Sequence, residues 1–129
     1  MTDASPPRDP RWGACSRDIK ALAILATLPS EVGAQVHAGA WLDVGCGSGL
    51  IAAELAQHVA SIHAIDPEPW ERWSSLAASR PNLHFHVGSY RELSTRVAPG
   101  SIDVAICNRV YEHVDSAADL LAQLHLVLG

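Results

Sequence analysis

A glycine-rich stretch, Asp43-Val44-Gly45-Cys46-Gly47-Ser48-Gly49, constrains the fold of this chain more than any other part of its sequence. It follows a short apolar run with strand character, residues 41–44, and it precedes residues 50–56, whose composition suits the first turns of a helix. A strand, a glycine turn and a helix in this order form a nucleotide-binding corner. Glycine is needed there because a Cβ would keep the backbone away from a ligand.

The spacing of the glycines narrows the choice of nucleotide. The dinucleotide fingerprint has a Gly or Ala three residues after the second glycine of its first pair. Counted from Gly45 and Gly47, that residue is Leu50, and the third glycine is Gly49 instead. A phosphate-binding loop would need a Lys-Ser or Lys-Thr pair, which does not follow. The pattern G-x-G-x-G therefore argues against both motifs.

A single acid, Asp66, follows the second apolar run, residues 61–65. Nucleotide-binding folds place a ribose-binding acid about 20 residues beyond the first glycine, at the end of the neighbouring strand. We therefore expect the Asp66 carboxylate to lie beside the glycine turn and to accept hydrogen bonds from ribose hydroxyls. Asp66 could also be the N-cap of a helix that begins at Pro67, and this role is compatible with ribose binding.

Length and composition exclude several classes of protein. The 129 residues predict one domain, and a net charge of −5 without a basic cluster argues against nucleic acid as the main partner. Three cysteines, Cys15, Cys46 and Cys107, form neither a disulfide framework nor a paired metal motif, which favours a reducing, cytoplasmic compartment. The Pro-rich start is no signal peptide, and the longest apolar run, residues 21–28, is too short for a bilayer, so no membrane partner is expected.

Hydrophobic periodicity predicts four strands alternating with helices. Strands are expected at residues 41–44, 61–65, 83–87 and 102–107, and helices at 17–28, 50–58, 67–79 and 115–128. Ser16 is the expected N-cap of the first helix and Pro29 its stop, and Asp115 is the expected cap of the last. This alternation predicts an α/β, Rossmann-like, doubly wound parallel sheet in residues 17–129, preceded by a flexible arm, residues 1–16.

Three helices have a predicted apolar face, and the histidines have no predicted role. The face of the first helix is Ile19, Leu22, Ala23, Leu25, Ala26 and Leu28. The face of the third helix is Trp70, Trp73, Leu76 and Ala77, and that of the last is Ala118, Leu121, Ala122, Leu124, Leu126 and Leu128. Six histidines are expected to be structural or at the surface, with no partner for the alternating pair on the third strand: His37, His58, His63, His84, His86 and His125.

Two segments resemble a known family, the class I S-adenosylmethionine-dependent methyltransferases. Residues 43–49 are similar to its first motif. Residues 102–114 are similar to the fourth strand and following loop of its small-molecule, type-11-like members, where Asn108 precedes a Glu112-His113 pair. Asp66 lies between them in the expected order, so the resemblance extends from residue 41 to residue 128.

The resemblance implies S-adenosylmethionine as cofactor and methyl transfer to a small-molecule acceptor. It implies that Ser89 touches the adenine, that Asp43 reaches the cofactor's amino group, and that Asn108 and Arg109 lie near its methionine end. The alternatives are that Ser89 is a turn serine and that Asp43 is a buried acid that accepts from the N–H groups of the glycine loop. His113 is then a candidate base, with loop shaping as the alternative, and no metal site is expected because Glu112 and His113 lack a third ligand. The full set of expected cofactor-binding residues is Asp43, Gly45, Cys46, Gly47, Gly49, Asp66, Pro67, Ser89, Tyr90, Asn108 and Arg109.

Members of this family continue beyond the helix at residues 115–128 with about three more strands, so the resemblance implies a sheet truncated after its fourth strand and helix. The implied strand order is third, second, first, fourth, which leaves the apolar fourth strand at an edge that could pair with a second copy or a partner chain. Two alternatives follow: a non-catalytic cofactor-binding module that needs a partner, and, against the evidence of Leu50, a fragment of an NAD-binding oxidoreductase.

Overall fold

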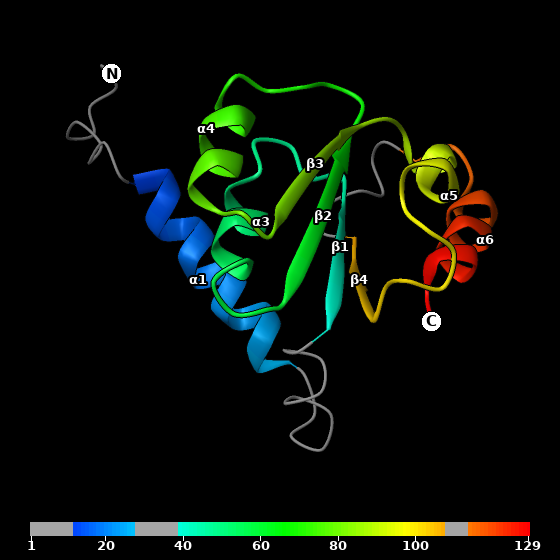
Figure 1. Cartoon of the computed structure of the whole chain (residues 1–129), viewed down its shortest axis with the longest axis horizontal. Helices are drawn as coiled ribbons and strands as arrows, with labels where there is room; N and C mark the ends of the chain where they lie inside the picture. Colours follow the sequence, from blue (N-terminus) through cyan, green and yellow to red (C-terminus); the bar gives the residue numbers. More distant parts are fainter. Residues whose placement is uncertain (1–11, 28–38, 108–113) are drawn as a thin grey trace, which may run out of the picture.

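A computed structural model describes residues 12–27, 39–107 and 114–129 of the chain (Figure 1). Its strands are β1 (Ala40–Val44), β2 (Ser61–Asp66), β3 (Leu83–Val87) and β4 (Val104–Ile106). Its helices are α1 (Trp12–Ala26), α3 (Leu50–Leu55), α4 (Arg72–Ser79), the 3-10 helix η1 (Tyr90–Glu92), α5 (Leu93–Arg96) and α6 (Ala117–Val127). Among the described residues, no helix is long and apolar enough to cross a membrane.

The strands form one parallel sheet in the order β3-β2-β1-β4, which confirms the predicted order. In Figure 1, α1, α3 and α4 lie on one side of this sheet, and α5 and α6 lie on the other. Successive strand residues point to opposite faces. Trp41 and Leu42 of β1 are both fully buried, the first in the cluster beneath α3 and the second in the cluster beneath α6. Helices therefore cover both faces of the sheet, which is the doubly wound arrangement predicted from the sequence.

Several helix boundaries differ from the predictions, and three of them by three residues or more. Helix α1 begins at Trp12, before the expected cap Ser16. Helix α3 ends at Leu55 rather than at residue 58, because the next amides, those of Gln57 and His58, bond only three residues back. Helix α4 begins at Arg72 rather than at residue 67, so the segment between Asp66 and Arg72 is a loop. The second proline of that loop, Pro69, disfavours helical backbone at the residue before it.

The chain after β3 differs most from the prediction. The segment after Ser89 forms η1 and α5, which were not predicted. Strand β4 is confined to Val104–Ile106 instead of residues 102–107. The cap of α6 is Ser116, whose hydroxyl accepts from the Asp119 N–H, so the prediction of Asp115 as cap was wrong.

The predicted apolar face of α1 was wrong in part, because Ile19 and Leu22 are exposed and Ala21 is buried instead. The predicted apolar face of α6 was also largely wrong, although Leu124 packs against the core as predicted. Leu120 and Val127 are buried beneath the sheet, whereas Leu121 is 64% exposed and Leu126 is 49% exposed. Apolar residues occupy all positions of this helix except Asp119, Gln123 and His125 and so lie on every side of it, which is why periodicity alone did not identify the buried side. Pro29 and His37 lie outside the described residues.

Candidate functional site

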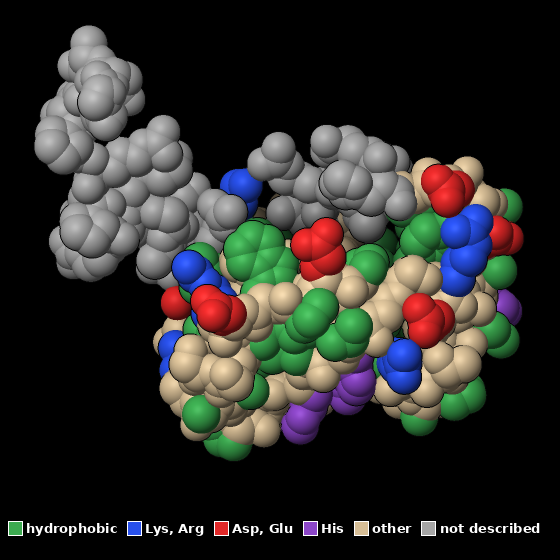
Figure 2. All heavy atoms as spheres, turned by 90° about the horizontal axis from the view of Figure 1, so that it is seen from above, with side chains coloured by type: hydrophobic (Ala, Val, Ile, Leu, Met, Phe, Trp, Pro, Cys, Tyr) green, Lys and Arg blue, Asp and Glu red, His purple; other side chains and the backbone are tan. Residues whose placement is uncertain are grey.

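The glycine turn lies at the carboxyl edge of the sheet, which faces the viewer in Figure 2. Gly45, Gly47 and Gly49 all have left-handed backbone, with φ of 73°, 55° and 85°. The N–H groups of Gly45 and Cys46 both donate to the Ile65 carbonyl, at 2.9 and 3.0 Å. These two bonds fasten the start of the turn to β2, so the turn stands directly beside Asp66.

Gly49 is a glycine because of packing. A Cβ at this position would lie 2.6 Å from the Phe85 ring. That ring stacks on Trp73, with centroids 4.7 Å apart and an angle of 8° between the planes, and the Trp73 indole N–H donates to the Gly47 carbonyl at 2.8 Å. The two aromatic side chains therefore support the turn from beneath.

Gly47 is a glycine for a different reason. A Cβ there would have no atom of the described chain within 4 Å, so the space above Gly47 is open. Its backbone can be approached closely from outside the protein, which is the property a ligand cradle requires.

Asp66 joins the turn to the end of β2, as predicted. One carboxylate oxygen accepts from the Gly47 N–H at 3.0 Å, and the other accepts from the Glu68 N–H at 3.0 Å. A carboxylate has about four acceptor positions, so Asp66 retains capacity for two further donors. The acid is therefore placed, and chemically able, to accept hydrogen bonds from a ligand held over Gly47.

Asp43 is the one charged residue that is buried in the part of the chain that the structure describes, with 3% of its surface exposed. Burial, and then the nearby charge of Asp66, raise the pKa of Asp43 to about 7. Burial also raises the pKa of the Cys46 and Cys107 thiols, with Asp43 as a further cause. Both thiols therefore favour the protonated form at neutral pH, which argues against a nucleophilic role.

A small pocket, called the base pocket below, lies beside the ends of the first three strands. Its volume is about 170 Å³, and its lining residues are Val44, Gly45, Ile65, Pro67, Gly88, Ser89, Tyr90, Arg91 and Asp115. Four predicted cofactor residues, Gly45, Pro67, Ser89 and Tyr90, meet here. Arg91 and Asp115 were not predicted to be at the site.

A capping box fixes the wall of the base pocket. The Ser89 hydroxyl accepts from the Arg91 N–H at 3.2 Å, and the Ser89 N–H donates to the Glu92 carboxylate at 2.9 Å. The sequence signal for this cap, Ser89 followed three residues later by Glu92, could have been recognised. It would have predicted η1.

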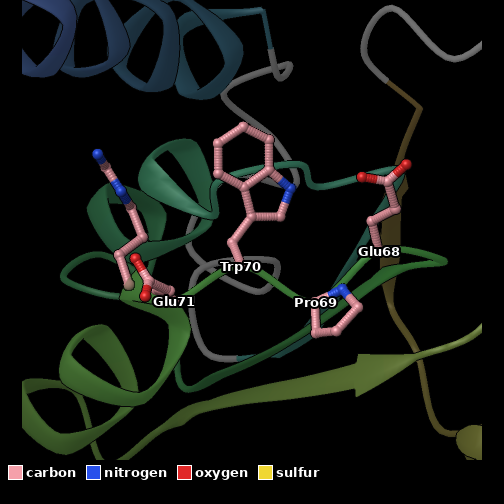
Figure 3. Close-up of a pocket in the computed structure, with 5 residues that line it drawn as sticks. Glu68, Pro69, Trp70 and Glu71 are labelled. Atoms are coloured by element: carbon pink, nitrogen blue, oxygen red, sulfur yellow. The ribbon is translucent and has the colours of Figure 1, made fainter.

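A larger cavity of about 670 Å³ adjoins the loop between β2 and α4; its described lining is Glu68, Pro69, Trp70, Glu71 and Arg72 (Figure 3). Trp70 is 47% exposed and precedes α4, so its predicted place on the helix face was wrong. Figure 3 shows the Trp70 ring and the Glu68 carboxylate both extending upward from the loop. The glycine turn does not contribute to the described lining of this cavity, so the base pocket is the better match to the predicted site.

Some predictions cannot be compared with the structure or were wrong. Asn108, Arg109 and His113 lie outside the described residues. The expectation that the histidines of β3 have no partner was wrong, because His63 Nδ1 and His86 Nε2 are 2.9 Å apart. No cluster of three or more metal-ligating side chains occurs among the residues described.

The parallel sheet, its glycine turn and the acid at the end of β2 define the class of nucleotide-binding α/β proteins. The family follows from the sequence: residues 42–129 match the family described as Methyltransferase domain, and the chain belongs to that family. The resemblance seen in the sequence is therefore confirmed.

Two curated relatives share part of this chain. It is 34% identical over 84 residues to a ubiquinone biosynthesis O-methyltransferase of Albidiferax ferrireducens, covering 62% of this chain and 33% of that protein. It is 38% identical over 77 residues to the protein of the same name in Xanthomonas campestris, covering 57% of this chain and 31% of that protein. The chain thus spans about a third of the length of these relatives.

A solved structure shows the same fold. It is a SAM dependent methyltransferase from Aquifex aeolicus, with a TM-score of 0.68 and 18% identity, over 93% of this chain and 62% of that one. The four-stranded parallel sheet and its flanking helices are therefore those of the methyltransferase fold.

Proposed function

We propose that this chain binds S-adenosylmethionine along the carboxyl edge of its sheet and serves methyl transfer to a small-molecule acceptor. The observation that carries the proposal is the contact of the Asp66 carboxylate with the Gly47 N–H, beneath open space. This is a cradle that a Cβ would fill, beside an acid with spare acceptor capacity. The residues present therefore fit the nucleoside part of the cofactor.

Each residue of the cradle has a defined task in this proposal. Gly47 presents its backbone, Asp66 accepts from the ribose hydroxyls, and Pro67 and Tyr90 enclose the adenine in the base pocket. Asp43, with its pKa raised to about 7, favours its charged form when a cationic group such as an amino group comes near. When bound, S-adenosylmethionine supplies an electrophilic methyl group. The protein's contribution to the rate is then largely one of proximity and orientation.

The acceptor side of the proposal depends on the predicted loop. We assign Asn108 and Arg109 to the methionine end of the cofactor and His113 to the acceptor side as a candidate base. The two curated relatives are O-methyltransferases by name, which supports an oxygen atom as the methyl acceptor.

We also propose a cytoplasmic location, as the cysteine content suggests, and residues 17–129 as the cofactor-binding part of the catalytic unit. A second copy or partner chain pairing along β4 would supply further acceptor contacts.

Calorimetry with S-adenosylhomocysteine and with NAD tests the proposal. We expect the wild-type chain to bind S-adenosylhomocysteine and not NAD. Asp66→Ala should weaken binding by about 1–3 kcal/mol, the usual result of leaving hydrogen-bond partners unsatisfied. Asp103→Ala is the matched control, because Asp103 also accepts from a backbone N–H, that of Ala40 at 2.8 Å, but at the amino end of β1.

Binding of NAD alone, or an unchanged affinity in Asp66→Ala, would overturn the proposal. Methyl transfer from labelled cofactor to small molecules that carry a hydroxyl group then separates the enzyme from the alternative, a module that binds the cofactor without catalysis. Transfer is expected from the enzyme and is absent from the module.

A further inference from the structure

The base pocket has the size of one flat ring system. Its volume of about 170 Å³ is below the ~300–1,000 Å³ typical of sites for whole drug-sized ligands. Its sheet side is made of Val44, Ile65 and Gly88, which offer apolar surface or bare backbone. Specific recognition of a base must therefore come from the polar side chains at its rim.

Ser89 keeps its hydroxyl proton and one acceptor position for such a base, but no charge. Its hydroxyl already accepts from the Arg91 N–H, and its own N–H is taken by Glu92. The Tyr90 hydroxyl accepts from the Ser116 N–H at 3.2 Å. A neutral hydroxyl that is already engaged is a weaker acceptor than a carboxylate.

Asp115 supplies the carboxylate at this rim. Asp115 Oδ2 lies 3.6 Å from Arg91 Nη1, and Arg91 Nη2 lies 3.3 Å from Asp119 Oδ2. The Arg91 guanidinium also lies over the Tyr90 ring, 4.8 Å from its centroid. Asp115 lines the pocket within ion-pair distance of Arg91, and its carboxylate, with about four acceptor positions, keeps room for another donor.

The pair presents an acceptor and a donor side by side. Adenine carries an amino donor next to a ring nitrogen that accepts, so its edge complements Asp115 and Arg91. Hypoxanthine carries a carbonyl oxygen where adenine has the amino group. That oxygen would face the Asp115 carboxylate, and two acceptors without a proton between them repel.

We infer that Asp115 recognises the amino group of the cofactor's adenine and makes the site selective for adenine over hypoxanthine. This inference rests on the proposed function. It gives Asp115, which lies just before α6, the role that the sequence led us to expect for Ser89.

The test compares the binding of S-adenosylhomocysteine and S-inosylhomocysteine by calorimetry. The wild-type chain should bind the adenosyl compound at least tenfold more tightly. Asp115→Asn should reduce this ratio about tenfold, because its amide can donate to the hypoxanthine oxygen. Asp119→Asn is the matched control: it removes the other carboxylate partner of Arg91, does not line the pocket, and should leave the ratio unchanged.

The outcomes separate the inference from the proposed function. If the adenosyl compound binds and Asp115→Asn leaves the ratio unchanged, the inference is wrong and the proposed function stands. If both Asn variants reduce the ratio equally, selectivity comes from Arg91 and the inference is again wrong. If the wild-type chain binds neither compound, the proposed function itself fails. Both aspartates are exposed, with 87% and 56% of their side chains accessible, so both variants should fold, which thermal melting verifies.

Discussion

Gly47 and Gly49 lie in one turn and share left-handed backbone, but different forces require them. An L-residue in this conformation is destabilised by roughly 1–2 kcal/mol, and this applies to both. Gly49 also faces the Phe85 ring, whereas Gly47 faces open space. Gly47 therefore serves ligand access, and Gly49 serves the packing of the turn.

Two alanine substitutions should separate these roles. Gly49→Ala should lower the free energy of unfolding by about 1–3 kcal/mol more than Gly47→Ala, because the added methyl group overlaps the Phe85 ring. Gly47→Ala should fold and yet bind S-adenosylhomocysteine at least tenfold more weakly. Urea denaturation and calorimetry measure the two effects.

Gly100 provides the control for backbone strain. Its φ is 68°, and a Cβ there also has no atom of the described chain within 4 Å. Gly100→Ala should therefore lose stability as Gly47→Ala does and bind normally. Equal binding by the Gly47 and Gly100 variants would show that close approach to the backbone at Gly47 is not needed.

The residues of the glycine turn and Asp66 could be predicted because their positions follow from local order along the chain. A strand must end where the glycines begin, and a parallel neighbour brings its own end to the same edge. Asp115 and Arg91 could not be predicted in this way. Their contact joins segments before and after β4, and it depends on how η1 packs against α6, which no local pattern specifies.

At the scale of elements, the register of β2 and β3 brings three histidines together on one face of the sheet. His63 pairs with His84, and Ile65 pairs with His86, so all three imidazoles lie on the same side. The His63 ring lies 5.1 Å from each of the other two. Figure 2 shows histidine side chains gathered at one border of the molecule.

This histidine cluster should make stability depend on pH. Burial, and then His86 and His84, lower the pKa of His63 from 6.5 to about 4, and burial, His84 and Arg96 lower that of His86. The unfolded chain therefore binds more protons than the folded chain between pH 6.5 and about 4. The contribution of His63 to stability is fully present above pH 6.5 and is lost as the pH falls towards 4.

Thermal melting across this range measures the effect. His63→Gln should show a smaller loss of melting temperature between pH 7 and 4.5 than the wild-type chain. His58→Gln, at an exposed position outside the sheet, should follow the wild type. Asp43 acts in the opposite direction, because its raised pKa makes the folded chain lose stability as the pH rises from 3.8 to about 7. Because Asp43 is present in every chain, its effect cancels when each variant is compared with the wild type. Identical pH profiles for all three chains would contradict the role of His63.

Most elements could be predicted because buried strands are apolar and short, and helices are periodic. The strand order β3-β2-β1-β4 came from the family resemblance, and the start of α4 and the buried side of α6 were missed. A helix start depends on local competition, here the turn that Asp66 makes with Glu68 ahead of Pro69. The buried side of α6 depends on which apolar residues meet Ile102 and Leu42 across the fold.

For the whole molecule, β4 is the feature through which we expect contact with other chains. In the part of the chain that the structure describes, β4 has a strand on one side only. The Asp103 N–H donates inward to Ala40, so by alternation the N–H groups of Ile102, Val104 and Ile106 point outward. Ile102 is paired there: its N–H donates to the Val127 carbonyl and its carbonyl accepts from the Gly129 N–H. The outer edge is thus covered at Ile102, and Val104 and Ile106 continue beyond that cover.

We expect the 129-residue chain to associate through this edge. Residues 102–107 contain no proline or lysine, the residues that commonly protect an edge strand, and an apolar edge pairs readily with another strand. Sedimentation should show a mass that rises with protein concentration. Hydrogen exchange at Val104 and Ile106 should slow over the same range, while exchange at Ala105, whose N–H points inward, stays constant. A monomer at all concentrations with rapid exchange at Val104 and Ile106 would contradict this expectation, because the edge would then be open without recruiting a partner.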